Sequence, residues 1–88
     1  MDDVARLRAL FSPQCREHRY SVTFADGEAY DLAAVLSGQD RGEPPHADGI
    51  ILRVHRGRVS EGASLFFSLT DVSSVVDLDT NEQLFGAE

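Results

Sequence analysis

The feature that most constrains this chain is the alternation of apolar and polar side chains that begins at Tyr20. Tyr20, Val22 and Phe24 are separated by single polar residues, a period of two that is typical of a half-buried β-strand. The Asp26-Gly27 pair that follows is a strong signal for a tight hairpin turn, and the alternation resumes after it. The sequence therefore predicts an antiparallel hairpin that buries one face.

Further strands are indicated by short apolar runs that turn signals separate. These runs cover residues 50–54, 64–69, 73–78 and 83–85, and they are rich in the β-branched and aromatic residues that favour strands. Parallel strands need a crossover connection, and no helical segment stands between these runs, so antiparallel pairing is favoured. The predicted fold class is mainly β, a small SH3- or Sm-like antiparallel barrel of five or six strands with an N-terminal α-helix.

At 88 residues the chain is expected to form a single domain over residues 1–88. Its parts are a helix over about residues 3–11, a β-barrel over about 18–85 and a flexible loop over about 37–49, which is rich in Gly and Pro. The residues expected in the core are Val4, Leu7, Phe11, Tyr20, Val22, Phe24, Leu32, Ile51, Leu65, Phe67, Val75 and Leu78.

The charge of the chain is strongly acidic and unevenly distributed. Fifteen acidic side chains stand against eight basic ones, all of them Arg, for a net charge of −7. This balance argues against general binding to nucleic acid, because phosphate contacts need cations. It favours a non-enzymatic binding module that docks on a basic protein partner. The acids expected to bind that partner lie in the Arg-free C-terminal third of the chain and are Asp71, Asp77, Asp79 and Glu82.

A local basic cluster supports an alternative function. Arg53, His55, Arg56 and Arg58 stand together without an acidic residue among them. Arginine binds phosphate through two parallel hydrogen bonds and stacks on bases. The alternative is therefore an RNA-binding Sm-like protein that uses this hairpin, whereas a solvated hairpin tip is the structural explanation of the same residues.

Two metal motifs are present in incomplete form, so no metal or cofactor is predicted. Residues 77–88 place acidic and amide residues at EF-hand positions, but Glu82 stands where that loop needs Gly. An acidic turn is favoured there, with calcium binding left as an open alternative. Cys15 and His18 have zinc-ligand spacing, yet a structural zinc site needs four ligands.

The sequence also excludes several broad classes of protein. It contains no nucleophile elbow, Gly-rich phosphate loop or paired-carboxylate motif, so we expect no enzyme. No apolar run approaches the roughly 18 residues of a membrane span, and the acidic start lacks the basic region of a signal peptide. A single cysteine fits a reducing compartment. We expect a cytoplasmic protein without membrane contact, as a monomer or small homo-oligomer.

The predicted order of elements is similar to Sm-like folds, and two stretches carry a closer likeness. Through residues 20–28 (YSVTFADGE) and 69–75 (LTDVSSV) the chain resembles the Rof family of small acidic bacterial inhibitors of the Rho termination factor. The resemblance implies an N-terminal helix on a compact Sm-like barrel and a partner in the transcription or RNA machinery. Residues 30–34 lack the Asn of the uridine-binding signature of Sm and Hfq-type proteins, so the likeness does not extend to RNA-chaperone activity.

Overall fold

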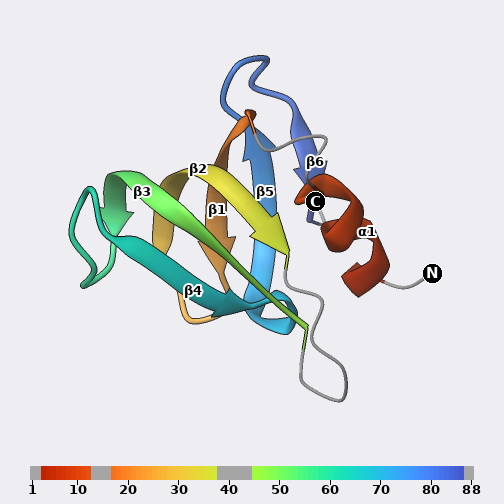
Figure 1. Cartoon of the computed structure of the whole chain (residues 1–88), viewed down its shortest axis with the longest axis horizontal. Coiled ribbons are helices and arrows are strands. Elements are labelled where there is room, and N and C mark those ends of the chain that lie inside the picture. Colours follow the sequence, from red (N-terminus) through yellow and green to blue (C-terminus); the bar gives the residue numbers. More distant parts are fainter. Residues whose placement is uncertain (1–2, 13–16, 38–44, 87–88) are drawn as a thin grey trace.

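The computed structural model describes residues 3–12, 17–37 and 45–86. Most of these residues belong to an antiparallel sheet of six strands (Figure 1). The strand order is β4-β3-β2-β1-β5-β6. The prediction of a mainly β fold with an N-terminal helix is confirmed. The elements are α1 (Asp3–Leu10), β1 (Arg19–Phe24), β2 (Ala29–Ser37), β3 (His46–Arg56), β4 (Ser64–Ser68), the 3-10 helix η2 (Leu69–Asp71), β5 (Val72–Asp77) and β6 (Gln83–Phe85).

The hairpin predicted from the alternation joins β1 and β2. Val22 lies opposite Tyr30 across the two strands, so their side chains share the buried face. The turn is closed by hydrogen bonds of 2.8 Å from the Phe24 amide to the Glu28 carbonyl and 2.9 Å from the Gly27 amide to the Phe24 carbonyl. Gly27 has φ of 97°, a left-handed conformation that favours glycine.

The sheet is strongly curved. Strands three places apart in a flat sheet lie roughly 14 Å apart, yet the rings of Phe24 on β1 and Phe67 on β4 have centroids 5.0 Å apart. Figure 1 shows β3 and β4 running across the direction of β1 and β5. Part of the bend lies at Ala34, where φ is 54° and the β2–β3 ladder is interrupted. The sheet is not closed, since β4 and β6 are its ends, so the predicted barrel is not confirmed.

The core lies inside this curve. Phe11 follows α1 and packs its ring edge-on against Tyr20 and Phe67, at centroid distances of 5.4 and 6.1 Å. The Tyr20 hydroxyl donates a hydrogen bond of 2.9 Å to the Leu10 carbonyl, which fixes the end of the helix on β1. The predicted core residues are buried except Val4, Leu65 and Leu78, which are half-buried. The structure adds Tyr30, Val35, Ala47, Leu69, Val72 and Phe85 to the core.

The loop expected over residues 37–49 is shorter than predicted. His46 to Gly49 belong to β3 and pair with β4, so this part of the prediction is wrong. Ala47 and Gly49 are buried, and Gly49 has no room for a side chain, because a Cβ there would lie 2.9 Å from Cγ2 of Val35. At the other end Ser37 belongs to β2, and residues 38–44 of the expected loop lie outside the described residues.

Two adjacent phenylalanines give a test of the curved core. Phe67 is 8% exposed and contacts two rings, whereas Phe66 is 66% exposed. We expect Phe67→Ala to lower the free energy of unfolding by about 3 kcal/mol, because it removes a buried ring and leaves a cavity. Phe66→Ala, the matched control, should change it by less than about 0.5 kcal/mol. Urea unfolding measures both, and equal losses would contradict the assignment of these two rings.

Candidate functional site

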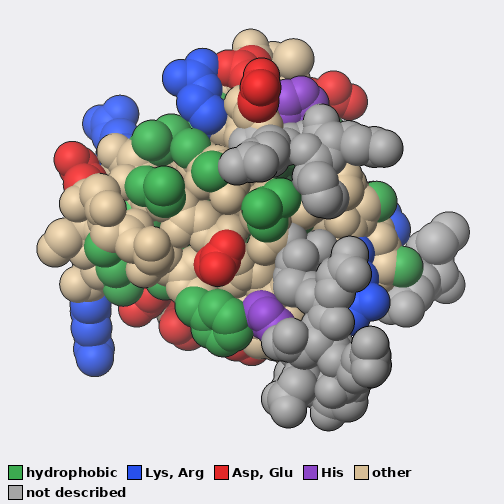
Figure 2. Space-filling view, viewed as in Figure 1, with side chains coloured by type: hydrophobic (Ala, Val, Ile, Leu, Met, Phe, Trp, Pro, Cys, Tyr) green, Lys and Arg blue, Asp and Glu red, His purple; other side chains and the backbone are tan. Residues whose placement is uncertain are grey.

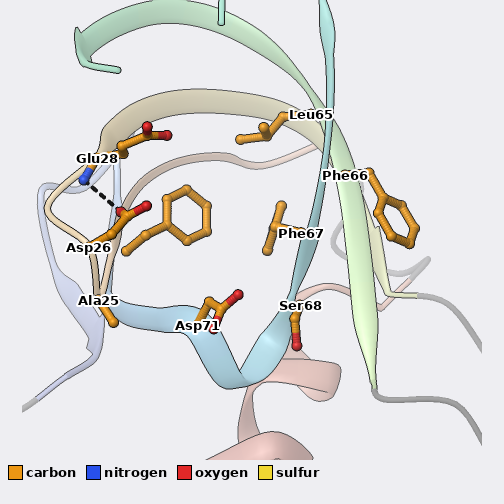
Figure 3. Close-up of a pocket in the computed structure, with 9 residues that line it drawn as sticks. Ala25, Asp26, Glu28, Leu65, Phe66, Phe67, Ser68 and Asp71 are labelled. Atoms are coloured by element: carbon orange, nitrogen blue, oxygen red, sulfur yellow. Dashed lines mark hydrogen bonds between the residues drawn. The ribbon is translucent and has the colours of Figure 1, made fainter. Parts of the chain in front are cut away.

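A pocket of about 420 Å³ lies between the β1–β2 turn, β4 and η2 (Figure 3). This volume falls within the usual size of ligand pockets. Two segments that are far apart in the sequence form its walls: the end of β1 with the β1–β2 turn, and β4 with η2, which directly follows it. The lining residues are Phe24, Ala25, Asp26, Glu28, Leu65, Phe66, Phe67, Ser68 and Asp71.

The floor of the pocket is apolar. It consists of the paired rings of Phe24 and Phe67, which are 7% and 8% exposed, with the half-buried Leu65 beside them. Figure 3 shows Leu65 and Phe67 pointing into the pocket and Phe66 pointing away from it. Because strand side chains alternate between faces, β4 presents one apolar surface to the pocket and a separate one to solvent.

The rim of the pocket carries three carboxylates. Asp26 and Glu28 belong to the β1–β2 turn, where Oδ1 of Asp26 accepts a hydrogen bond of 3.0 Å from the Glu28 amide. Asp71 ends η2, and its carbonyl accepts a hydrogen bond of 2.8 Å from the Ala25 amide, which ties η2 to the turn. Among the described residues that line the pocket there is no Lys, Arg or His. The site therefore has an apolar floor below a rim of three carboxylates, and the guanidinium of Arg56 lies beside Gly27 of the turn, outside the lining.

The buried Tyr30 side chain positions the Glu28 carboxylate. Its hydroxyl donates a hydrogen bond of 2.9 Å to Oε1 of Glu28 and accepts bonds of 3.1 Å from the Arg58 amide and 3.4 Å from the Val59 amide. Burial raises the pKa of the Tyr30 phenol above its usual value, with the Glu28 carboxylate as a second cause. A Cβ at Gly57 would meet the Tyr30 oxygen at 1.9 Å, so glycine there makes room for the ring.

The structure does not gather the four predicted partner-binding acids into one surface. Asp71 lies at the pocket, just before β5 begins, whereas Asp77, Asp79 and Glu82 surround the turn after β5. The five residue steps along β5 separate the two ends by roughly 16 Å.

The acids at the β5–β6 turn differ in what they do. Asp77 is 9% exposed, and its Oδ1 accepts hydrogen bonds of 2.8 and 3.4 Å from the amides of Asp79 and Thr80, so it stabilises the turn. Asp79 forms an ion pair with Arg19, and the arginine also donates a hydrogen bond to the Asp79 carboxylate. This hydrogen bond raises the pKa of the Arg19 guanidinium. Glu82 is exposed and forms no ion pair with any described residue.

The basic residues of the alternative site lie at the end of β3 and in the bend that follows. Arg53, His55, Arg56 and Arg58 are all exposed. Nε2 of His55 lies 2.8 Å from Oδ1 of Asp31, which is 9% exposed on the outer face of β2. The three arginines form no ion pair with any residue in the described part of the chain.

Neither metal motif finds a complete ligand set in the described structure. Residues 77–85 form the end of β5, a turn and β6, instead of a loop between two helices. Glu88 and Cys15 lie outside the described residues. Within residues 3–12, 17–37 and 45–86, no three His, Cys, Asp or Glu side chains are grouped so that they could hold a metal ion. The helices of the same residues include none with the length and apolarity of a membrane span.

Comparison of this chain with protein-family models, curated proteins and solved structures finds no match. The likeness to Sm-like and Rof proteins therefore stays a prediction, and the site rests on its own geometry. Asp71 is the one acid predicted from the sequence that lines this pocket, whereas Asp26 and Glu28 were interpreted only as part of a turn. The available signal was that no basic residue stands near Asp26 and Glu28 in the sequence. Nothing in the local sequence indicated that β4 and η2 would lie beside them.

The assignment of Asp77 to the turn gives a second prediction. We expect Asp77→Ala to lower the free energy of unfolding by about 1–2 kcal/mol, because two amides lose their acceptor. Glu82→Ala, the control at the same turn, should change it by less than about 0.5 kcal/mol. Thermal and urea unfolding measure the difference. An Asp77→Ala variant as stable as wild type would show that the carboxylate is not structural.

The raised pKa of Tyr30 predicts a loss of stability at alkaline pH. The folded state favours the protonated phenol, so this contribution is complete below the unfolded pKa of about 10 and is lost as pH rises through the folded pKa. The free energy of unfolding, measured in urea from pH 9 upward, should decline less steeply in Tyr30→Phe than in wild type. Parallel declines in the two proteins would contradict the prediction.

Proposed function

We propose that this chain is a non-enzymatic binding module whose pocket docks on a basic segment of a protein partner. One observation carries the proposal: Asp26, Glu28 and Asp71 surround an apolar floor with no described cation among the lining residues. Lysine and arginine side chains have an apolar stem and a charged head. Such a side chain can lay its stem on Phe24 and Phe67 and bring its head to the carboxylates.

The charge of the whole chain supports the same kind of partner. At a net charge of −7 the protein attracts basic surfaces over a distance and repels acidic ones. Complementary charge at an interface mainly accelerates association and improves specificity. Of the acids predicted from sequence, this proposal keeps Asp71 at the centre and leaves the β5–β6 turn as a peripheral acidic surface.

The proposal includes two further predictions made from the sequence, the barrel-like fold and the class of partner. The strong curl of the sheet supports an open variant of the SH3- or Sm-like barrel. The Rof-like resemblance supports a partner in the transcription or RNA machinery of the cytoplasm. Neither prediction depends on the pocket, which could bind a basic segment whatever the fold family or the process in which the partner acts.

RNA contact is the second candidate function, because Arg53, Arg56 and Arg58 are exposed and unpaired among the described residues. The arginines lie on β3 and the bend after it, and none of them lines the pocket. A filter-binding titration with mixed single-stranded RNA distinguishes the two functions. Binding that falls with salt and with arginine-to-glutamine changes at these positions would favour RNA.

Charge-matched variants test the pocket directly. The pocket variant carries Asp26→Asn, Glu28→Gln and Asp71→Asn, which keep an acceptor at each position. The control carries Glu17→Gln, Glu61→Gln and Glu82→Gln, three exposed acids that do not line the pocket. Both variants change the net charge equally, so a non-local charge effect would weaken them alike.

The readout is the affinity for a labelled arginine-rich peptide, measured by fluorescence anisotropy at low and moderate salt. We expect the pocket variant to bind about tenfold more weakly or worse, because three ion pairs are lost. The control should stay within about twofold of wild type. Equal weakening of both variants would show that the pocket is not the binding site.

A further inference from the structure

Strand β4 forms one wall of the pocket and is also an end strand of the sheet. End strands present unpaired main-chain groups, and proteins usually protect them with charges, proline or a covering segment. The sequence of β4 is SLFFS, which has no charge and no proline. Figure 2 shows hydrophobic side chains at the surface over β3 and β4, and the exposed large ones are Ile50, Leu52 and Phe66.

Two hydrogen bonds identify which main-chain groups of β4 face β3. The Ile51 amide donates to the Ala63 carbonyl at one end of the ladder, and the Leu69 amide donates to the Pro45 carbonyl at the other, both at 2.9 Å. In an antiparallel ladder, opposite pairs alternate between bonded and unbonded. The end pairs of the ladder, Ile50–Ser64 and His46–Ser68, each lie next to one of these bonded pairs. The end pairs are therefore of the unbonded kind.

The alternation leaves Phe66 with its main chain directed outward. Leu65 and Phe67 lie opposite Gly49 and Ala47 in the bonded pairs and direct their N–H and C=O groups toward β3. Phe66, between them, directs its own N–H and C=O to the open edge. It lines the pocket although its ring points away, so its main chain faces the pocket.

We propose that the basic partner segment binds as an extended strand added to the free edge of β4, with alternate side chains in the acidic pocket. This inference rests on the proposed function and specifies its binding mode. Strand addition supplies affinity through main-chain hydrogen bonds, and pockets for alternate side chains supply specificity. Here the main-chain groups of Phe66 provide the bonds, and the three carboxylates provide the charge.

The register of the added strand defines a sequence pattern for the partner. A residue directly opposite Phe66 places its side chain on the outer face, beside the exposed ring, which favours an apolar residue. Its two neighbours lie opposite Leu65 and Phe67 and point into the pocket. Those two positions favour arginine or lysine. The partner segment is therefore basic–apolar–basic in an extended conformation.

The acidic charge of the pocket favours a basic strand at the β4 edge over the β4 strand of a second copy of the chain. Pairing of two β4 strands would place two acidic pockets side by side, and like charges at an interface are costly. A basic strand gains from the same carboxylates that repel a copy. Self-association through β4 is accordingly an outcome that the test below must exclude.

Hydrogen exchange of single amides tests the binding mode. The probe is the capped peptide Val-Arg-Val-Arg-Val, in which the central valine can lie opposite Phe66. At about ten times its Kd, we expect the peptide to slow exchange of the Phe66 amide about tenfold. The Phe67 amide is already bonded to β3 and should change far less. Unchanged exchange at Phe66 with the peptide bound would overturn strand addition.

A second peptide separates this inference from the proposed function. N-methylation of the central valine removes the N–H that would bond to the Phe66 carbonyl and should weaken binding about tenfold. If both peptides bind equally and the pocket variant still weakens them, strand addition is wrong and the acidic pocket stands. If binding ignores the pocket acids altogether, both proposals are wrong. Concentration-dependent protection of Phe66 in the protein alone would assign the edge to a second copy and overturn the inference.

Discussion

The contact between the rings of Phe24 and Phe67 is the interaction on which the rest of the structure depends. It joins β1 to β4, which the strand order separates by two intervening strands, and so requires the sheet to curl around its own core. Phe11 completes the cluster from the helix side. Because interiors are packed to near-crystalline density, this aromatic centre fixes how far the sheet can open.

The curl also produces the pocket. It brings the β1–β2 turn, β4 and η2 together, and each contributes one part: two carboxylates, an apolar wall with a free edge, and a third carboxylate. None of these parts binds a basic segment well alone, since exposed ion pairs contribute little individually. In the function we propose, their combination over an aromatic floor favours a cation on an apolar stem.

The extent to which the sequence predicted this arrangement follows from the range of the interactions involved. The hairpin and its turn are local, so the alternation at Tyr20 and the Asp26-Gly27 pair were sufficient. Ala47 and Gly49 were interpreted as loop residues, because their small size comes from packing against β2 and β4, which is a tertiary requirement. Of the acids predicted from the sequence only Asp71 lines the pocket, since the proximity of Asp26 and Glu28 to η2 depends on the curl. Asp77 carried the right charge, but its carboxylate is used by its own turn.

The central claim is that the sheet folds β4 over β1, and nuclear Overhauser effects test it most directly. With centroids 5.0 Å apart, the ring protons of Phe24 and Phe67 should give strong cross-peaks. The Ala25 amide, bonded to the Asp71 carbonyl at 2.8 Å, should show cross-peaks to protons of η2. Their absence in a sample that retains the β3–β4 cross-strand contacts would mean a flatter sheet. In a flatter sheet the β1–β2 turn and η2 would not meet, and the pocket would not form.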